Sequence, residues 1–263
     1  MPNLMSLRSD AAAELGALLR SFQPDADRDV LLSDGEAIVL DLHLVATATL
    51  LVDGNAQGFF LGLCRMAENW RRLIVLLRSR NLPPPSVRRL TPLHAALAAG
   101  HFRLAEALAA VSATQRQSDD YEDEYLWGCI LQGLARQESP TTLAPLLNRL
   151  EVVAENTHGP HVALTRALLA RDAEGFAKAF ETLHHAHGSD IEARAKAFDT
   201  PVTAFAPHRF IWLEGLALLR LAARAGVAPE TTEYRYCPPL ARLPMTAVYR
   251  GDWTIPGADL DSA

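Results

Sequence analysis

Along most of this chain, apolar residues recur with the period of an α-helix, and this pattern limits what the chain can fold into. Four apolar residues between Ala11 and Phe22 fall on one helical face and predict a first helix over residues 9–22. A second helix is expected after a turn at Ser33-Asp34-Gly35. Before residue 230, no stretch alternates in the manner of a half-buried strand. The sequence therefore predicts an all-α fold.

Short polar breaks divide the helical pattern, and a large aromatic residue follows three of them. These aromatic residues are Trp70, Phe102 and Phe176, and a further break falls at Ser139-Pro140. Breaks spaced by roughly 30 to 40 residues are typical of stacked helical hairpins. We therefore expect an α-solenoid-like bundle in which the three aromatic residues begin second helices and act as core anchors. The three breaks before them are expected at Ala67-Glu68-Asn69, Gly100-His101 and Asp172-Ala173-Glu174-Gly175.

The whole chain is expected to form one helical domain over residues 1–263. Within it, residues 1–55 hold N-terminal helices, residues 56–226 hold the hairpins, and residues 227–263 form an extended, proline-rich tail packed on the helical body. Prolines recur too often in the tail for a long helix. The tail is expected to be anchored by its aromatic residues, which are Tyr234, Tyr236, Tyr249 and Trp253.

One hexapeptide, Thr91-Pro92-Leu93-His94-Ala95-Ala96, matches the signature of an ankyrin repeat. It occurs once, whereas an ankyrin array needs about three stacked copies for stability. The segment is therefore interpreted as a helical hairpin with a similar turn. Between this segment and the helix before it, Pro83-Pro84-Pro85 is expected to form a stiff, extended connector.

Composition points to a protein of the cytoplasm. The three cysteines Cys64, Cys129 and Cys237 have no CxxC spacing, which argues against a disulfide framework and a zinc knuckle. Residues Met1 to Asp10 lack a secretory leader pattern, and no apolar run is expected to span a membrane. No nucleotide-binding, hydrolase or metalloprotease motif is present. We expect no enzymatic activity and no cofactor.

Histidines provide the best remaining case for chemistry. His158 and His161 begin one predicted helix, whereas His184, His185 and His187 are placed at the end of the next. In an antiparallel hairpin the two groups would meet, and two imidazoles spaced by three residues can bind one metal ion. Histidines at helix ends more commonly cap carbonyls or face solvent. No bound metal is therefore expected.

Acidic residues are concentrated in one short segment. Five of them lie within six residues in a chain of net charge −6, and Tyr121 and Tyr125 are interleaved with them. One or two carboxylates would complement the dipole of the following helix, but five repel one another unless positive charge offsets them. Binding of a basic partner is one interpretation, and a solvated helix start is the other. The candidate partner-binding residues are Asp119, Asp120, Tyr121, Glu122, Asp123 and Glu124.

Arginines dominate the stretch from Arg65 to Arg89, where Glu68 is the one acidic residue. Such a stretch could contact nucleic-acid phosphates. Its arginines, however, flank an apolar stripe that includes Trp70, as on the solvent side of a buried helix. The stretch could also pair with the acidic residues 119–124, which would weaken both functional interpretations. Nucleic-acid binding is not expected.

Four segments are distinctive in their order along the chain. They are Asp120 to Tyr125, Leu168 to Phe176, Leu213 to Leu219 and Tyr234 to Leu240. Together they resemble the immunity-49 family of bacterial polymorphic-toxin systems, and the resemblance extends over roughly residues 60 to 245. It implies a helical, non-enzymatic protein that binds a cognate toxin and blocks its active or substrate-binding site.

Two functional hypotheses follow from the sequence. The first is an immunity protein whose partner is a toxin with a basic active-site surface. The second is a helical-repeat adaptor that binds an endogenous partner. An enzyme that uses the histidines ranks third, and no membrane partner is expected.

Overall fold

The computed structural model describes residues 3–154, 158–197, 200–229, 233–251 and 255. Within these residues it contains helices and no strand, and one isolated bridge joins Tyr234 to Cys237. The all-α prediction is confirmed. The helices are α1 (Leu4–Ser21), α2 (Arg28–Asp53), α3 (Ala56–Ser79), α4 (Thr91–Ala98), α5 (Phe102–Val111), α6 (Glu122–Ala135), α7 (Pro140–Val153), α8 (Gly159–Ala170), α9 (Ala173–Lys196), α10 (Val202–Phe205), α11 (Leu213–Ala225) and α12 (Pro239–Arg242).

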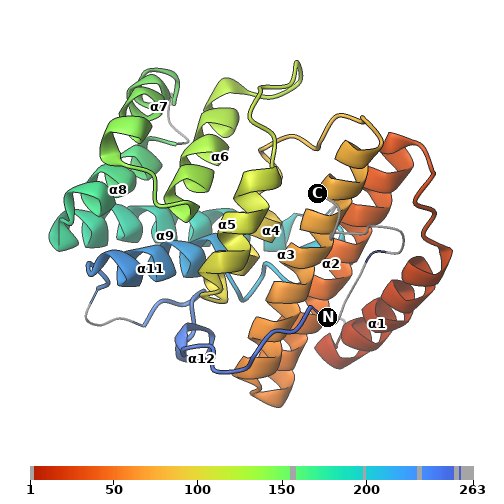
Figure 1. Ribbon diagram of the computed structural model, residues 1–263. Coiled ribbons are helices and arrows are strands. Elements are labelled where there is room, and N and C mark those ends of the chain that lie inside the picture. The colour runs from red at the N-terminus through yellow and green to blue at the C-terminus, as the bar shows by residue number, and fades with distance from the viewer. Residues whose placement is uncertain (1–2, 155–157, 198–199, 230–232, 252–254, 256–263) are drawn as a thin grey trace.

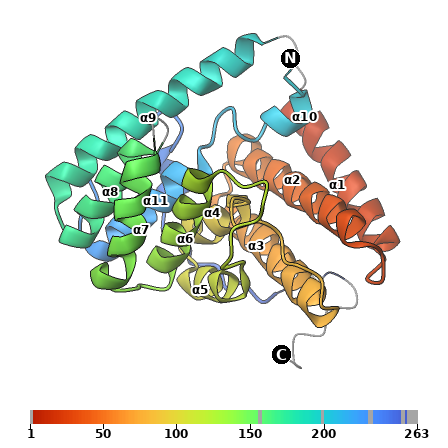
Figure 2. The ribbon, with the colours of Figure 1, turned by 90° about the horizontal axis from the view of Figure 1, so that it is seen from above.

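Helices that are neighbours in the sequence pack as hairpins, as the pattern of breaks predicts. The pairs α1 and α2, α2 and α3, α4 and α5, α6 and α7, and α8 and α9 are each in contact. Figure 1 shows α1 to α3 on one side, α6 to α9 on the other, and α4 and α5 between them. Helix α11 returns from the C-terminal part of the chain to pack against α4 and α8. In Figure 2, α9 extends from α8 toward α10 and the start of α1.

Two predicted breaks are wrong because their polar residues are accommodated inside helices. Helix α2 already begins at Arg28 and continues through Gly35. A Cβ atom at Gly35 would lie 2.3 Å from Leu73 Cδ2, so this glycine permits close packing of α2 on α3 rather than a turn. Helix α3 continues through Glu68, whose carboxylate is bound within the same helix. Trp70 therefore lies in the middle of a helix and does not begin one.

The other predicted breaks are real, and local hydrogen bonds explain where each new helix starts. Gly100 adopts a left-handed φ of 72°, and the His101 ring then accepts a hydrogen bond from the Leu104 amide. The Asp172 carboxylate caps α9 by accepting from the Gly175 amide at 3.0 Å. Ser139 caps α7 in the same way, with proline in the first turn. The ankyrin-like hexapeptide lies within α4, and α4 and α5 form one ordinary hairpin.

One large apolar core runs through the bundle from α1 to the tail. Trp70 and Phe176 are buried in it, as predicted. Phe102 begins α5 and is only partly buried, with the Arg224 guanidinium 4.3 Å above its ring. The largest fully buried side chains are Phe59, Phe60, Phe176 and Phe180. These rings fill the spaces where neighbouring hairpins meet.

The tail is not established as an extended segment, because α12 interrupts it. Tyr236 is buried, and its carbonyl accepts a hydrogen bond from the Trp212 amide at 2.8 Å. Further along, the side-chain oxygen of Gln57 accepts from the Thr246 amide at 2.8 Å. These contacts join the tail to α3 and to the start of α11. Pro256 and Trp253, which contributed to the tail prediction, lie outside the described residues.

The prediction that no apolar run is long enough to span a membrane is corrected by helix α2. By length and composition alone, this 26-residue helix could cross a bilayer. Half of its most apolar window is buried, as expected for a core helix covered by α1 and α3.

The core assignment can be tested with two aromatic truncations of different burial. Phe176→Ala should lower the free energy of unfolding by about 3–5 kcal/mol, because it empties a fully enclosed space. Phe102→Ala should cost clearly less, since part of that ring is already exposed to solvent. Urea unfolding followed by circular dichroism measures both. Equal losses would contradict the burial described for Phe102.

Candidate partner-binding site

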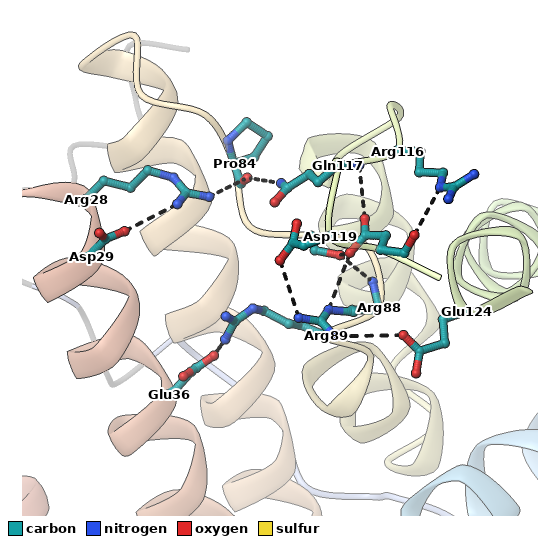
Figure 3. Close-up of polar contacts among 12 residues, drawn as sticks. Arg28, Asp29, Glu36, Pro84, Arg88, Arg89, Arg116, Gln117, Asp119 and Glu124 are labelled. Carbon is teal, nitrogen blue, oxygen red and sulfur yellow. Dashed lines mark hydrogen bonds and ion pairs between the residues drawn. The ribbon is translucent and has the colours of Figure 1, made fainter. Parts of the chain in front are cut away.

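The acidic segment spans the end of the loop after α5 and the first turn of α6. Tyr121 occupies the N-cap position, and Glu122, Asp123 and Glu124 form the first turn of the helix. Carboxylates here complement the positive end of the helix dipole, which explains why α6 begins at this point. Figure 3 shows how the segment faces the connector before α4.

Asp120 is buried and has a structural role. Its carboxylate accepts hydrogen bonds from the Ser86 hydroxyl group and, at 3.1 Å, from the Gln117 amide. The guanidinium of Arg88 lies 3.4 Å from the same carboxylate. These contacts fasten the loop to the connector (Figure 3). Asp120 is therefore not part of a solvated helix start, which was one interpretation of the segment.

Arg88 also faces two more exposed carboxylates of the segment. Its nitrogens lie 3.7 Å from Asp119 and 3.8 Å from Glu124 (Figure 3). One guanidinium thus offsets much of the repulsion among the carboxylates around it. Internal pairing, which the sequence left as an alternative, is what the structure shows for this arginine.

The remaining two carboxylates contact side chains from later in the chain. Glu122 accepts two hydrogen bonds from Arg149 of α7, at 2.6 and 2.9 Å. This hydrogen-bonded pair lowers the pKa of Glu122 below its ordinary value. Asp123 lies 3.0 Å from His158 Nδ1, at the start of α8. All five acidic residues therefore have a positively charged or ionisable neighbour within the chain.

Tyr121 stands apart from this network. Tyr121 is 71 % exposed. Among the large apolar and aromatic residues that the structure describes from α1 to α7, Val152 alone is more exposed, at 74 %. Its neighbour Tyr125 differs, because its hydroxyl group donates to the Thr114 carbonyl and so belongs to the fold. Tyrosine is enriched at protein interfaces and among the residues that contribute most to binding.

A polar crevice of about 260 Å³ adjoins the segment. Arg89 pairs with Glu36 across it, and Arg28 donates to the carbonyls of Pro83 and Pro84. Figure 3 shows the pair and the contact with Pro84. Two of the three prolines thus present acceptors to arginine, in keeping with a stiff connector.

Most arginines of the stretch from Arg65 to Arg89 are engaged within the protein. Arg71 and Arg72 share the buried carboxylate of Glu68. Arg80 donates to the carbonyls of Pro24 and Ala26 in the loop before α2, and Arg78 to the carbonyl of Ser112. Arg78 and Arg80 thus join α3 to neighbouring segments of the chain.

Two histidines, His43 and His161, are buried, and most of the others are half-buried. His161 lies 3.0 Å from the Glu214 carboxylate and packs against Trp127. His184 and His187 pack against Trp212. Helix α9 continues to Lys196, so the prediction that these two residues and His185 end a helix is wrong. Among the described residues, no group of three or more histidine, cysteine or acidic side chains is arranged to hold a metal ion.

Five histidines and Glu214 have shifted pKa values. Burial lowers the pKa of His187 to about 4 and lowers the pKa values of His43, His94, His184 and His208 below the ordinary 6.5. For Glu214, burial alone would raise the pKa, but the hydrogen bond and charge of His161 bring it to about 2. The lowered pKa values favour the neutral form of the five rings of His43, His94, His184, His187 and His208 at pH 7.

With this geometry established, the chain is defined as an all-helical stack of hairpins with a fixed, highly charged surface at the start of α6. The family model of immunity protein 49 matches residues 44–240, and the chain belongs to this family. The match begins within α2 and ends within α12, which confirms the resemblance expected from residue 60 to 245. No curated protein and no solved structure matches the chain.

Sequence reasoning located the acidic residues but not the groups that hold them. Ser86, Arg88 and Arg149 come from a connector and a helix about 30 residues away on either side. The only available signal was the arginine-rich stretch, whose last residues include Arg88. Nothing in a single sequence indicates which arginine reaches which carboxylate.

The structural role of Asp120 can be separated from the surface role of its neighbour. Asp120→Ala should destabilise the protein by about 3 kcal/mol, because it leaves buried donors and the Arg88 charge without their acceptor. Asp119→Ala removes an exposed carboxylate and should change stability by about 1 kcal/mol or less. Urea unfolding of the two variants provides the comparison. Similar losses would show that Asp120 is not the anchor of the loop.

The histidine shifts predict a loss of stability in mild acid. The five rings have lower pKa values in the folded protein than in the unfolded chain, so protonation favours unfolding as pH falls below 6.5. Asp41 opposes this trend, because burial raises the pKa of its carboxyl group to about 6 and its protonation therefore favours the folded state. It is one group against five. The urea midpoint should therefore fall between pH 7 and pH 5. In His187→Phe the fall should be smaller, and an identical pH profile would contradict the assignment.

Proposed function

We propose that this chain neutralises a cognate protein toxin by binding it and occluding its active or substrate-binding site in the cytoplasm. Membership of the immunity protein 49 family is the observation that carries the proposal. An inhibitor of this kind needs a preformed, rigid surface, because ordering flexible groups on binding weakens affinity. The network around Arg88 supplies such a surface.

The proposed toxin-binding surface consists of Asp119, Tyr121, Glu122, Asp123 and Glu124. Their carboxylates are held by partners within the chain, so they keep their positions before a toxin arrives. Asp120 lies beneath them and acts through its hold on the loop. Tyr121 is exposed among these acidic residues, and we propose it as the residue that anchors the toxin.

Charge suggests what the toxin surface is like. A row of fixed carboxylates complements a basic surface, such as the groove of an enzyme that acts on a polyanion. The carboxylates would then occupy positions that substrate charges take. Complementary charge of this kind mainly accelerates association and selects the partner.

The proposal is tested by co-expression with the toxin domain encoded beside this gene. The chain should restore growth of cells that produce the toxin and should co-purify with a catalytically inactive toxin domain. If growth is not restored and no complex forms, the immunity function is wrong for this pair. Co-purification with a host protein in place of the toxin would favour an adaptor function.

Two substitutions distinguish the anchor from the charges around it. Tyr121→Ala should weaken toxin binding at least tenfold, mainly through faster dissociation. Asp119→Lys should slow association at least tenfold at low salt, and the deficit should shrink as ionic strength rises. Binding kinetics on an immobilised, inactive toxin domain measure both effects.

Asp10→Lys on α1 provides the matched control, because it makes the same charge change at another exposed position. Its association rate should stay within about twofold of the original chain, as expected for a charge beyond the screening length of the interface. Unchanged kinetics in folded Tyr121→Ala and Asp119→Lys would remove this segment from the interface. The family assignment would stand in that case.

A further inference from the structure

A cavity of about 230 Å³ lies where α2, α3 and the start of α4 meet the segment after α10. Its volume is roughly that of eight molecules of liquid water. None of the acidic residues 119–124, all of which the structure describes, lines it. The cavity is therefore separate from the proposed toxin-binding surface. Its wall includes Glu36 and His43 of α2, Trp70 of α3, Arg89 of the connector, Pro92 of α4, and His208.

His43 is a buried polar group that lacks a partner beside this cavity. Its side chain lines the wall, although only 1 % of the residue is exposed. Its Nε2 atom is enclosed and has no hydrogen-bond partner among the described residues. A buried nitrogen in this state is costly, and nearly all such atoms in native proteins are satisfied. The cavity next to His43 therefore has the space and the need for a polar ligand.

The wall of the cavity has little net charge. Burial lowers the pKa of His43 well below its ordinary value, and burial also lowers the pKa of His208. The two rings meet edge to face, with their centroids 4.8 Å apart. Glu36 and Arg89 form an ion pair, which Figure 3 shows. A charged ligand would lose its hydration here without gaining a free counter-charge, so the cavity complements an uncharged one.

We propose that this cavity binds a small, uncharged molecule that combines one ring with an amide or hydroxyl group. A neutral imidazole nitrogen donates or accepts one hydrogen bond, and an amide or hydroxyl group can supply either partner to Nε2 of His43. The ring of the ligand would contact the apolar part of the wall, which includes Val39, Leu40 and Pro92. Apolar walls with a few placed polar groups are typical of small-molecule sites. The inference does not depend on toxin binding.

The test uses benzamide as the probe and follows the imidazole nitrogens of the full chain, labelled with isotopic histidine, by NMR. Benzamide should shift the resonances of one imidazole in a saturable way, with a dissociation constant of about 1 mM or below, as expected for a ligand of so few atoms. Benzoate and benzylammonium have similar rings but opposite charges. Both should bind at least tenfold more weakly, because the wall leaves their charges unpaired.

Two variants locate the binding. His43→Phe keeps a ring of similar shape but removes Nε2, so it should abolish the shifted resonances and lower the affinity for benzamide at least tenfold. Thr91→Leu changes a partly exposed residue of the wall and narrows the cavity, so it should also weaken binding at least tenfold. His185→Phe is the control, because it makes the same substitution at an exposed histidine outside the cavity. This control should bind benzamide as the original chain does.

Saturation-transfer NMR on benzamide measures affinity in each variant, and circular dichroism with the urea midpoint confirms that each is folded. Thr91→Leu provides the decisive comparison if His43→Phe does not fold. Four outcomes would overturn the proposal. They are an absence of saturable benzamide binding, which would leave the cavity to water; benzoate or benzylammonium binding as tightly as benzamide; a shift confined to histidines other than His43; and full affinity in a folded His43→Phe or Thr91→Leu variant.

Discussion

Helix α11 holds the two sides of the molecule together, because its three interior polar side chains each bind a different helix. Arg224 donates to the carbonyls of Leu134 and Ala135 at the end of α6. Arg220 donates to the Ala98 carbonyl at the end of α4. Helix ends leave carbonyls without partners and carry partial negative charge, so an arginine stabilises them in two ways. The rest of α11 is apolar and fills the centre of the stack.

Glu214, the third polar residue of α11, gives His161 a structural role. Glu214 reaches His161 at the start of α8, and His161 in turn packs on Trp127 of α6. A partly buried carboxylate is tolerated because this hydrogen bond favours its charged form. The same ring could have been a metal ligand, but its Nε2 atom is already committed to the carboxylate. The structure thus gives the imidazole a positioning role between helices.

The contacts of α11 also bear on the start of α6. The acidic segment rests on one helix that α11 holds at its far end, and on a connector whose prolines restrict motion. In the proposed toxin-binding surface, carboxylates held in this way and an exposed Tyr121 would need little ordering when a partner binds. The acidic charges that looked uncompensated in the sequence are largely compensated by groups inside the chain. They therefore do not require a basic partner, but their fixed positions could orient one.

The sequence by itself determined the helical class, the hairpin breaks marked by caps at His101, Ser139 and Asp172, and the family. These features depend on apolar periodicity and on side chains that bond to backbone groups two or three residues away, which a linear pattern records. Only the tertiary structure decided that Gly35 and Glu68 lie inside helices and that Asp120 is buried. Two of these findings depend on which distant segments meet: Leu73 against Gly35, and Ser86 against Asp120. Contacts between segments far apart in a chain leave no local period, so a single sequence cannot specify them.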